Sequence, residues 1–172
     1  GIVAQHATGL GAQVEFVSVS GSDEARDYAQ NAFKKSGVNA HLIVDESRPT
    51  TIKQKFRSKG KSLLRVNHLH QDAINSSLQD KISKIIDSVI QDVDLLVFSD
   101  FNYGCLPQLL VDKLIKLANA NNVMLAADSQ SSSQIGDISR FKGVNLITPT
   151  EREARISSRN HEDGLVVLAQ QL

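Results

Sequence analysis

The sequence predicts an α/β protein built on a doubly wound parallel sheet, with a smaller sheet projecting from it. β-type and helix-type runs alternate along most of the chain with short connections, as in parallel folds. Residues 93–98 and 123–127 are almost entirely apolar, which is typical of strands buried on both faces of a parallel sheet. Between residues 41 and 66, short β-type runs follow one another without a helix, which indicates the separate small sheet.

The composition restricts the class of protein. The 172 residues are 41% hydrophobic and 22% charged, which is ordinary globular usage and excludes disorder throughout. The 19 basic residues balance the 19 acidic ones, so a globally basic nucleic-acid binder is not expected. The single cysteine, Cys105, cannot form an internal disulfide, which favours a reducing, cytoplasmic compartment. Apolar runs are too short to span a bilayer, so no membrane partner is expected.

The first elements follow from β propensity and helix-end signals. Residues 14–19 predict a strand. A helix follows, with Ser22 as its cap, acidic residues in its first turn, lysines in its last turn and Gly37 at its end. In the small sheet, residues 50–57 alternate between a basic face and a thinner apolar face: Thr51, Lys53, Lys55 and Arg57 on one side, Ile52, Gln54 and Phe56 on the other.

The rest of the chain alternates helix and strand. Ser76 and Gln79 predict a capping box that begins a helix. The apolar stripe of that helix repeats at helical spacing: Leu78, Ile82, Ile85, Ile86 and Val89. Strands are predicted at residues 93–98, 123–127 and 144–147, a helix at 106–119, and a last helix from about Thr150.

Three of these strands end in polar clusters, at residues 99–104, 128–130 and 148–153. Open α/β sheets bind ligands beyond the carboxyl ends of their strands, so the clusters are candidates for one crevice. A helix N-terminus there would attract phosphate, and carboxylates could hold Mg²⁺ directly or through water. The alternative is that each polar residue only caps a helix or forms a turn. Three clusters at one edge favour a nucleotide or a phosphorylated ligand.

The projecting sheet is strongly basic. From Ser47 to Gln71 there is no acidic residue, but there are seven basic ones: Arg48, Lys53, Lys55, Arg57, Lys59, Lys61 and Arg65. Such a sheet could cover an anionic small molecule, or it could be a solvated edge that discourages aggregation. Phe56 is its only aromatic residue, which argues against a platform for stacking nucleic-acid bases.

Other candidate motifs are weaker. His68 and His70 would share one face of a strand, but two ligands do not make a metal site, and no cysteine pair accompanies them. Cys105 has no base beside it in the sequence, and we expect it to be structural. The chain contains no Walker A motif, dinucleotide fingerprint or nucleophile elbow.

Several ordered segments resemble the ribokinase-like (phosphofructokinase-B type) carbohydrate kinases. The branch they are most similar to is the heptose-7-phosphate kinase domain of bifunctional ADP-heptose synthases. The segments are Arg48-Pro49-Thr50-Thr51-Ile52-Lys53, Leu63-Leu64-Arg65-Val66, Ser99-Asp100-Phe101, Asp128, Thr148-Pro149 and Glu153-Ala154, with Leu10-Gly11-Ala12 and Gly21-Ser22-Asp23-Glu24 nearer the start.

The resemblance implies a ribokinase-like αβα sandwich with a β-sheet lid that covers the sugar and pairs two copies into a homodimer. Residues 1–40 and 67–172 would be parts of the core, and residues 41–66 the lid. It implies ATP-dependent phosphorylation of a sugar or sugar phosphate with Mg²⁺. The implied substrate-binding residues are Arg48, Lys53, Arg65, Asp100 and Asn102. The implied nucleotide or phosphate residues are Asp128, Thr150 and Glu153, with Glu153 reaching Mg²⁺ through water.

The sequence also departs from the family pattern. The family's Gly-Ala-Gly-Asp segment, which holds the catalytic aspartate, does not occur, and the N-terminal strand region is not represented. Thr150 stands where the family has asparagine, Tyr103 and Gln130 stand where the heptose kinase branch has lysines, and Ile2 aligns with an asparagine that binds the sugar. We therefore expect this chain to be part of a longer protein and inactive alone. The alternative is a non-catalytic ribokinase-like module that binds a ligand or dimerises.

Overall fold

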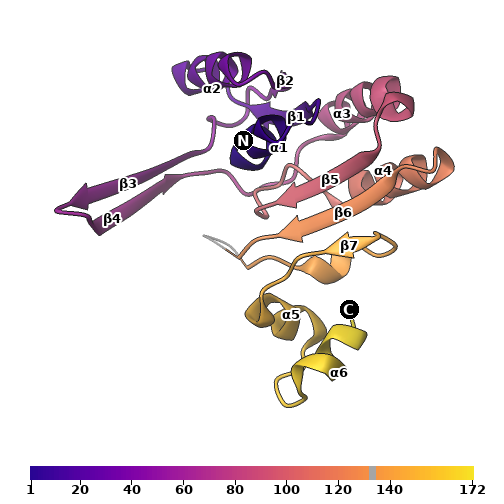
Figure 1. Cartoon of the computed structure of the whole chain (residues 1–172). Coiled ribbons are helices and arrows are strands. Elements are labelled where there is room, and N and C mark those ends of the chain that lie inside the picture. Colours follow the sequence, from indigo (N-terminus) through magenta and orange to yellow (C-terminus); the bar gives the residue numbers. More distant parts are fainter. Residues whose placement is uncertain (132–134) are drawn as a thin grey trace. The chain divides into compact units, whose positions relative to one another are not determined.

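The computed structural model describes residues 1–131 and 135–172 as two compact units (Figure 1). The first unit comprises Gly1–His70 with Asn75–Ile82, and the second comprises Gln71–Ile74 with Ser83–Leu172. Helix α3 (Ser76–Val89) passes from one to the other. Its apolar stripe faces inward as predicted, because Leu78, Ile82 and Ile86 are buried. Its cap is not Ser76 but Asn75, whose Oδ1 accepts a hydrogen bond from Leu78 N at 3.0 Å.

The first unit begins with a parallel strand pair. Its elements are α1 (Ile2–Gly9), β1 (Glu15–Ser20), α2 (Glu24–Lys35) and β2 (Asn39–Val44). Strands β1 and β2 pair from Glu15 opposite Asn39 to Ser20 opposite Val44. A small apolar core holds the elements together, and in it the rings of Phe16 and Phe33 lie 4.7 Å apart.

Two expectations for this unit are corrected. Residues 41–44 were expected in the small projecting sheet, but they belong to β2 and pair with β1. Leu42 packs against the unit's core, which a projecting sheet could not provide. Helix α2 is capped by Asp23 rather than Ser22, because Asp23 Oδ1 accepts from Arg26 N at 3.0 Å.

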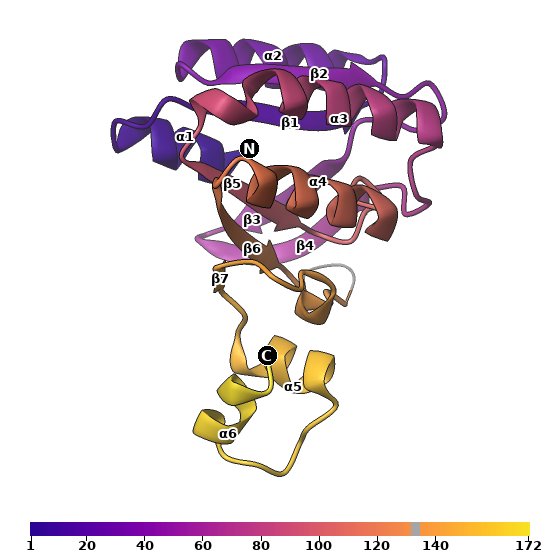
Figure 2. The same ribbon diagram turned by 90° about the vertical axis from the view of Figure 1, so that its right-hand side faces the viewer.

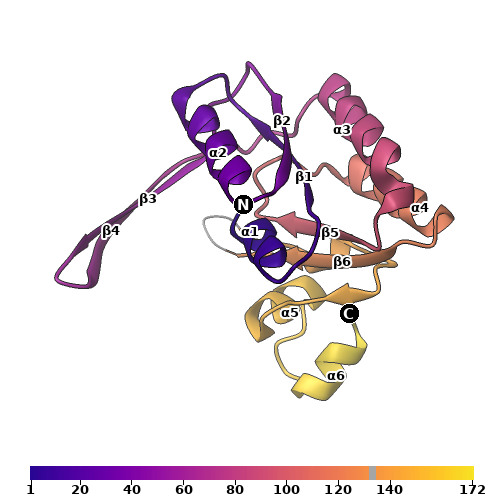
Figure 3. The same ribbon diagram turned by 45° about the horizontal axis from the view of Figure 1, so that its top comes forward.

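The small sheet is an antiparallel hairpin of β3 (Ile52–Ser58) and β4 (Lys61–His68), which extends away from β1 and β2 (Figures 1 and 3). Lys59 and Gly60 form its turn, both at positive φ. The register gives the two predicted faces from Ile52 to Phe56, and a bulge between Phe56 and Arg57 interrupts the alternation before Arg57. Lys53, Lys55, Arg65 and Asn67 lie on one face, which we call the cationic face. Ile52, Phe56, Leu64 and Val66 lie on the other, which we call the apolar face.

The second unit is a parallel sheet in the order β5-β6-β7, covered on one side by a helix (Figure 2). Its elements are η1 (Ile90–Asp92), β5 (Leu95–Asp100), α4 (Gln108–Ala120), β6 (Met124–Ser129), η2 (Ile138–Arg140), β7 (Leu146–Ile147), α5 (Glu151–Ser158) and α6 (Leu165–Gln170). Phe98, Leu125 and Ala127 are buried on one face of this sheet. The other face, which we call the open face, leaves Leu95, Val97, Met124 and Leu146 45–59% exposed.

The predicted α/β class with parallel strand pairing is therefore correct. In the residues that the structure describes, no helix has the length and apolar character needed to cross a membrane.

Candidate functional site

The carboxyl ends of β5 and β6 bring two of the predicted residues to one edge of the sheet. Asp128 lies opposite Ser99, and Asp100 lies opposite Ser129. Because neighbours in register share a face, Asp128 lies on the open face and Asp100 on the buried face. The backbone joins the two ends directly, since Gln130 N donates to the Asp100 carbonyl at 2.8 Å.

Asp128 is the carboxylate that this edge presents to the open face. Its side chain is half-buried and receives two hydrogen bonds from its neighbours. Gln130 Nε2 donates to Oδ2 at 2.7 Å, and Thr148 Oγ1 donates to Oδ1 at 3.2 Å. A carboxylate has about four acceptor positions, so Asp128 keeps capacity for a ligand.

Thr150 and Glu153 form a capping box at the start of α5. Thr150 Oγ1 accepts from Glu153 N at 3.3 Å, and Glu153 Oε2 accepts from Thr150 N at 2.8 Å. The other carboxylate oxygen of Glu153 accepts from Ser131 N at 2.6 Å. Burial alone would raise the pKa of Glu153, but the hydrogen bonds from Thr150 and Ser131 outweigh it and lower that pKa. Glu153 is therefore an ionised, buried capping residue.

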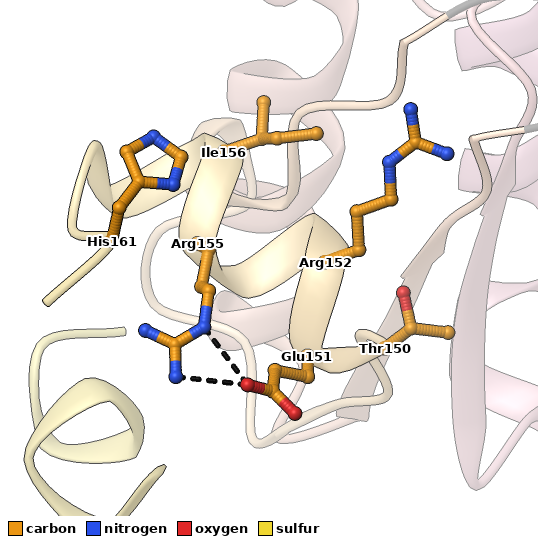
Figure 4. Close-up of a pocket in the computed structure, with 6 residues that line it drawn as sticks. All are labelled: Thr150, Glu151, Arg152, Arg155, Ile156 and His161. Carbon is orange, nitrogen blue, oxygen red and sulfur yellow. Dashed lines mark hydrogen bonds and ion pairs between the residues drawn. The ribbon is translucent and has the colours of Figure 1, made fainter. Parts of the chain in front are cut away.

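A cleft of about 560 Å³ lies beside α5 (Figure 4). Its lining residues are Thr150, Glu151, Arg152, Arg155, Ile156 and His161. Figure 4 shows Arg155 turned toward Glu151, with Nε and Nη2 at 2.9 and 2.8 Å from Oε1, and Arg152 turned away from this pair. Of the predicted phosphate residues, Thr150 alone lines this cleft.

Asp100 and Asn102 are joined to each other and to Arg140. Asp100 is 4% exposed, and its Oδ1 accepts from Asn102 N at 2.9 Å. Its Oδ2 accepts from Arg140 Nη1 at 3.1 Å. Asn102 is exposed and has φ 57°, and its side-chain amide donates to the Ile135 carbonyl at 3.0 Å. Arg140 could not be predicted from the sequence, because nothing in its local pattern distinguishes it from a surface arginine.

The basic residues predicted to face the sugar divide into two groups. Lys53 and Arg65 are exposed and share the cationic face of the hairpin. Arg48 does not join them, because it is buried and its Nε donates to Asp45 Oδ2 at 2.5 Å. Burial alone would raise the pKa of Asp45, but hydrogen bonds from Ser47 and the charge of Arg48 lower it.

The residue that leads into β3, Thr50, is hydrogen-bonded to the segment that follows β1. Asp23 Oδ2 accepts from Thr50 N at 2.8 Å, and Thr50 Oγ1 accepts from Gly21 N at 3.0 Å. A Cβ on Gly21 would lie 2.7 Å from the Arg48 carbonyl, so only glycine fits at this crossing.

Glu153 is predicted to contact Mg²⁺ through water. Within residues 1–131 and 135–172, no three or more His, Cys, Asp or Glu side chains are grouped to hold a metal ion. A contact of Mg²⁺ with Glu153 through water, as the sequence predicts, needs no such group of side chains.

Comparison with known proteins finds similarity over almost the whole chain. The profile of the pfkB family of carbohydrate kinases matches residues 3–172. The bifunctional protein HldE of Pseudomonas aeruginosa (strain UCBPP-PA14) is 33% identical over 172 residues, which are 99% of this chain and 34% of that protein. The chain spans about a third of the length of the curated relatives it matches.

Solved structures share the fold at lower identity. Ribokinase from Giardia lamblia matches with a TM-score of 0.66 and 17% identity, over 91% of this chain and 47% of its own. Fructokinase with bound ATP from Xylella fastidiosa matches with a TM-score of 0.69 and 14% identity, over 98% of this chain and 56% of its own. These matches confirm the predicted ribokinase-like fold.

Proposed function

The chain belongs to the pfkB family of carbohydrate kinases, and we propose that it forms part of an enzyme that phosphorylates a sugar or sugar phosphate with ATP. The observation that carries the proposal is the edge of the β5-β6-β7 sheet, where Asp128 and Thr148 meet on the open face. The family's chemistry needs positioning and charge neutralisation more than covalent steps, and polar groups fixed by their neighbours suit that task. The fructokinase of Xylella fastidiosa, which has the same fold, was solved with ATP bound.

The substrate class that we propose is a sugar carrying a phosphate, and a heptose 7-phosphate is the first to test. The cationic face of the hairpin supports this choice, because Lys53, Lys55 and Arg65 lie together there without an acidic residue from Ser47 to Gln71. A dianionic phosphate gains most from several exposed cations held on one surface. Arg48 has a different task in this proposal: its ion pair with Asp45 fixes the base of the hairpin.

We propose that Asp128, Thr150 and Glu153 bind the nucleotide and its phosphates. Bound ATP would supply the phosphoryl group, and Mg²⁺ would arrive with it rather than rest on protein ligands. Glu153 would reach that ion through water, because it is buried and already accepts three hydrogen bonds, from Ser131 N, Thr150 N and Thr150 Oγ1. The capping box keeps Glu153 ionised and Thr150 fixed at the start of α5.

We also propose that the hairpin is a lid that pairs two copies into a homodimer. A two-stranded hairpin is marginal in water unless its apolar face is covered. Phe56 is 49% exposed and Leu64 is 56% exposed on that face. A second copy would supply an equivalent apolar face and would leave the cationic face for the substrate.

The active enzyme in this proposal extends beyond these 172 residues. Parallel sheets are normally covered on both faces, yet the open face leaves four large apolar side chains exposed. The matched part of each solved relative is about half of that relative, and the chain contains no Gly-x-Gly-Asp string. We expect the chain alone to be inactive. The protein proposed to be active has about the length of the solved relatives, and we call it the extended protein.

A charge-neutralisation experiment tests the substrate class. In the extended protein, Lys53→Gln with Arg65→Gln is expected to raise the KM for a sugar phosphate at least tenfold and to leave the KM for ATP within about twofold. Lys34→Gln on α2 is the matched control, because it removes an exposed lysine outside the hairpin. Equal effects on the two KM values, or no effect on either, would contradict the assignment of the cationic face.

A second candidate is a non-catalytic ribokinase-like module that binds a ligand or dimerises. The observation that favours it is the engagement of Asp100 and Glu153, whose carboxylate oxygens all accept hydrogen bonds within the protein. This candidate predicts ligand binding without ADP formation in the extended protein.

A further inference from the structure

Arg140 contacts both ends of the segment that follows β5, residues 101–106, which we call the β5 loop. Its Nη1 donates to Asp100 Oδ2 at 3.1 Å, where the loop begins. Its Nη2 donates to the carbonyl of Leu106, where the loop ends. A guanidinium carries its donors in a rigid planar fork, so one arginine can hold two groups at a set separation.

Arg140 is itself fixed. Its Nε donates to Gln108 Oε1 at 3.3 Å, and Gln108 Nε2 donates back to the Arg140 carbonyl at 3.0 Å. The guanidinium lies 5.4 Å from the centroid of the buried Phe141 ring. Its side chain is only 16% exposed, so water screens the contact with Asp100 weakly.

The β5 loop has a backbone that must be held. Asn102 has φ 57° and Gly104 has φ 75°. Asparagine tolerates positive φ better than other non-glycine residues, but the conformation still costs free energy, and contacts that fix the loop offset this cost. On one side, Ile74 N donates to the Gly104 carbonyl at 3.0 Å, and a Cβ on Gly104 would lie 2.0 Å from the Asp72 carbonyl oxygen. On the other side, Asp100 and Arg140 hold the two ends of the loop, and the side-chain amide of Asn102 donates to the Ile135 carbonyl.

We propose that Arg140 is a positioning residue that sets the conformation of the β5 loop and, through it, the direction of Asn102 at the candidate site. Asp100 acts with it. This carboxylate lies on the buried face of the sheet, and its oxygens accept from Asn102 N and Arg140, so it holds the loop and not the ligand. The resemblance to the carbohydrate kinases implies that Asn102 binds the sugar, and this part of the inference rests on the proposed function, whereas the conformation of the loop does not.

The conformation can be tested on the chain as it stands. Tyr28 and Tyr103 are its two tyrosines, so 3-fluorotyrosine labelling gives one signal from α2 and one from the loop. Tyr103 stacks on Phe101 with ring centroids 5.9 Å apart, so its signal reports the loop. In Arg140→Met and Arg140→Lys, we expect the Tyr103 resonance to move by more than its line width.

Two controls make the result interpretable. The Tyr28 resonance should stay where it is, which shows that the first unit remains folded. Lys142→Met removes an exposed lysine two residues from Arg140 and should move neither signal. A Tyr103 resonance that does not move in Arg140→Met or in Arg140→Lys overturns the proposal.

Kinetics of the extended protein test the consequence for the site. Arg140→Met is expected to raise the KM for the sugar about tenfold with kcat within about twofold, because a misdirected Asn102 weakens binding and not the transfer step. A fall in kcat at unchanged KM contradicts this role. A wild-type protein without kinase activity would contradict the proposed function, and the fluorine shift would then decide the role of Arg140 by itself.

Discussion

The β3–β4 hairpin exposes nearly all of its side chains, whereas the polar residues at the edge of the β5-β6-β7 sheet are held by one another. All residues of the two hairpin strands except Ile52 and Val66 are exposed. At the sheet edge, Asp100, Asp128 and Glu153 each accept hydrogen bonds on both oxygens. A substitution at the edge should therefore change the free energy of unfolding, and one on the hairpin should change what the hairpin contacts.

The base of the hairpin is the exception to this contrast and should show the largest effect on stability. Arg48→Met leaves the carboxylate of Asp45 buried without its guanidinium partner. We expect a loss of about 3–5 kcal/mol in the free energy of unfolding, measured by urea denaturation. Arg57→Met, at an exposed arginine on the same hairpin, should cost less than about 0.5 kcal/mol. Equal costs for the two variants would contradict a structural role for the Arg48–Asp45 pair.

Gly104→Ala should have the next largest effect. The positive φ of Gly104 disfavours any side chain, and the added Cβ would also meet the Asp72 carbonyl. Together these effects should cost about 2–4 kcal/mol. Gly143→Ala is the matched control, because Gly143 has φ 83° but nothing within 4 Å of its Cβ position. The control should cost only about 1 kcal/mol, and a similar cost at both sites would show that the loop is not packed against Asp72.

Glu153→Gln should cost about 1–2 kcal/mol at neutral pH. The folded-state pKa of Glu153 lies below its ordinary value of 4.5, so ionised Glu153 stabilises the protein above that pH. The difference in unfolding free energy between wild type and variant should shrink as pH falls below 4.5 through the lowered pKa. Glu151→Gln, at an exposed neighbour that pairs with Arg155, should cost less than about 0.5 kcal/mol. Denaturation curves between pH 3 and pH 7 measure both, and an unchanging difference would contradict the capping role.

Phe56→Ser should have the smallest effect on stability and a large effect on association. The side chain is 49% exposed, so the free energy of unfolding of the monomer should change by less than about 0.5 kcal/mol. Sedimentation of the extended protein should show a dimer in wild type and a monomer in the variant. Tyr28→Ser removes an aromatic residue that is 78% exposed on α2 and should leave the dimer intact. A wild-type monomer would contradict the homodimer.

The sequence predicted local features better than long-range ones. The helical stripe of α3 and the alternation of β3 from Ile52 to Phe56 depend on spacing within one element, and they agree with the structure. The assignment of residues 41–44 to the small sheet was wrong because the same apolar run fits either strand partner. Caps shifted by one residue, from Ser22 to Asp23 and from Ser76 to Asn75, since several adjacent residues could cap.

The candidate site shows the same limit. Spacing brought Asp100 and Asp128 to one sheet edge, but it could not tell which faces the open side, because a one-residue change of register exchanges the faces. Arg140 contacts Asp100, from which it is separated by 40 positions in the sequence, and no local pattern predicts such a contact. The charge of residues 48–65 was visible in the sequence, but the burial of Arg48 was not.

Titration of ATP with Mg²⁺ into the extended protein, followed by calorimetry, tests the kinase assignment most directly. Wild type should give a saturable heat of binding. Asp128→Asn should weaken that binding at least tenfold, because it removes a carboxylate that the sheet edge presents to the open face. Asp112→Asn, at an exposed aspartate on α4, should bind as wild type does. No heat above the buffer blank at millimolar ATP would contradict the kinase assignment and leave the non-catalytic module.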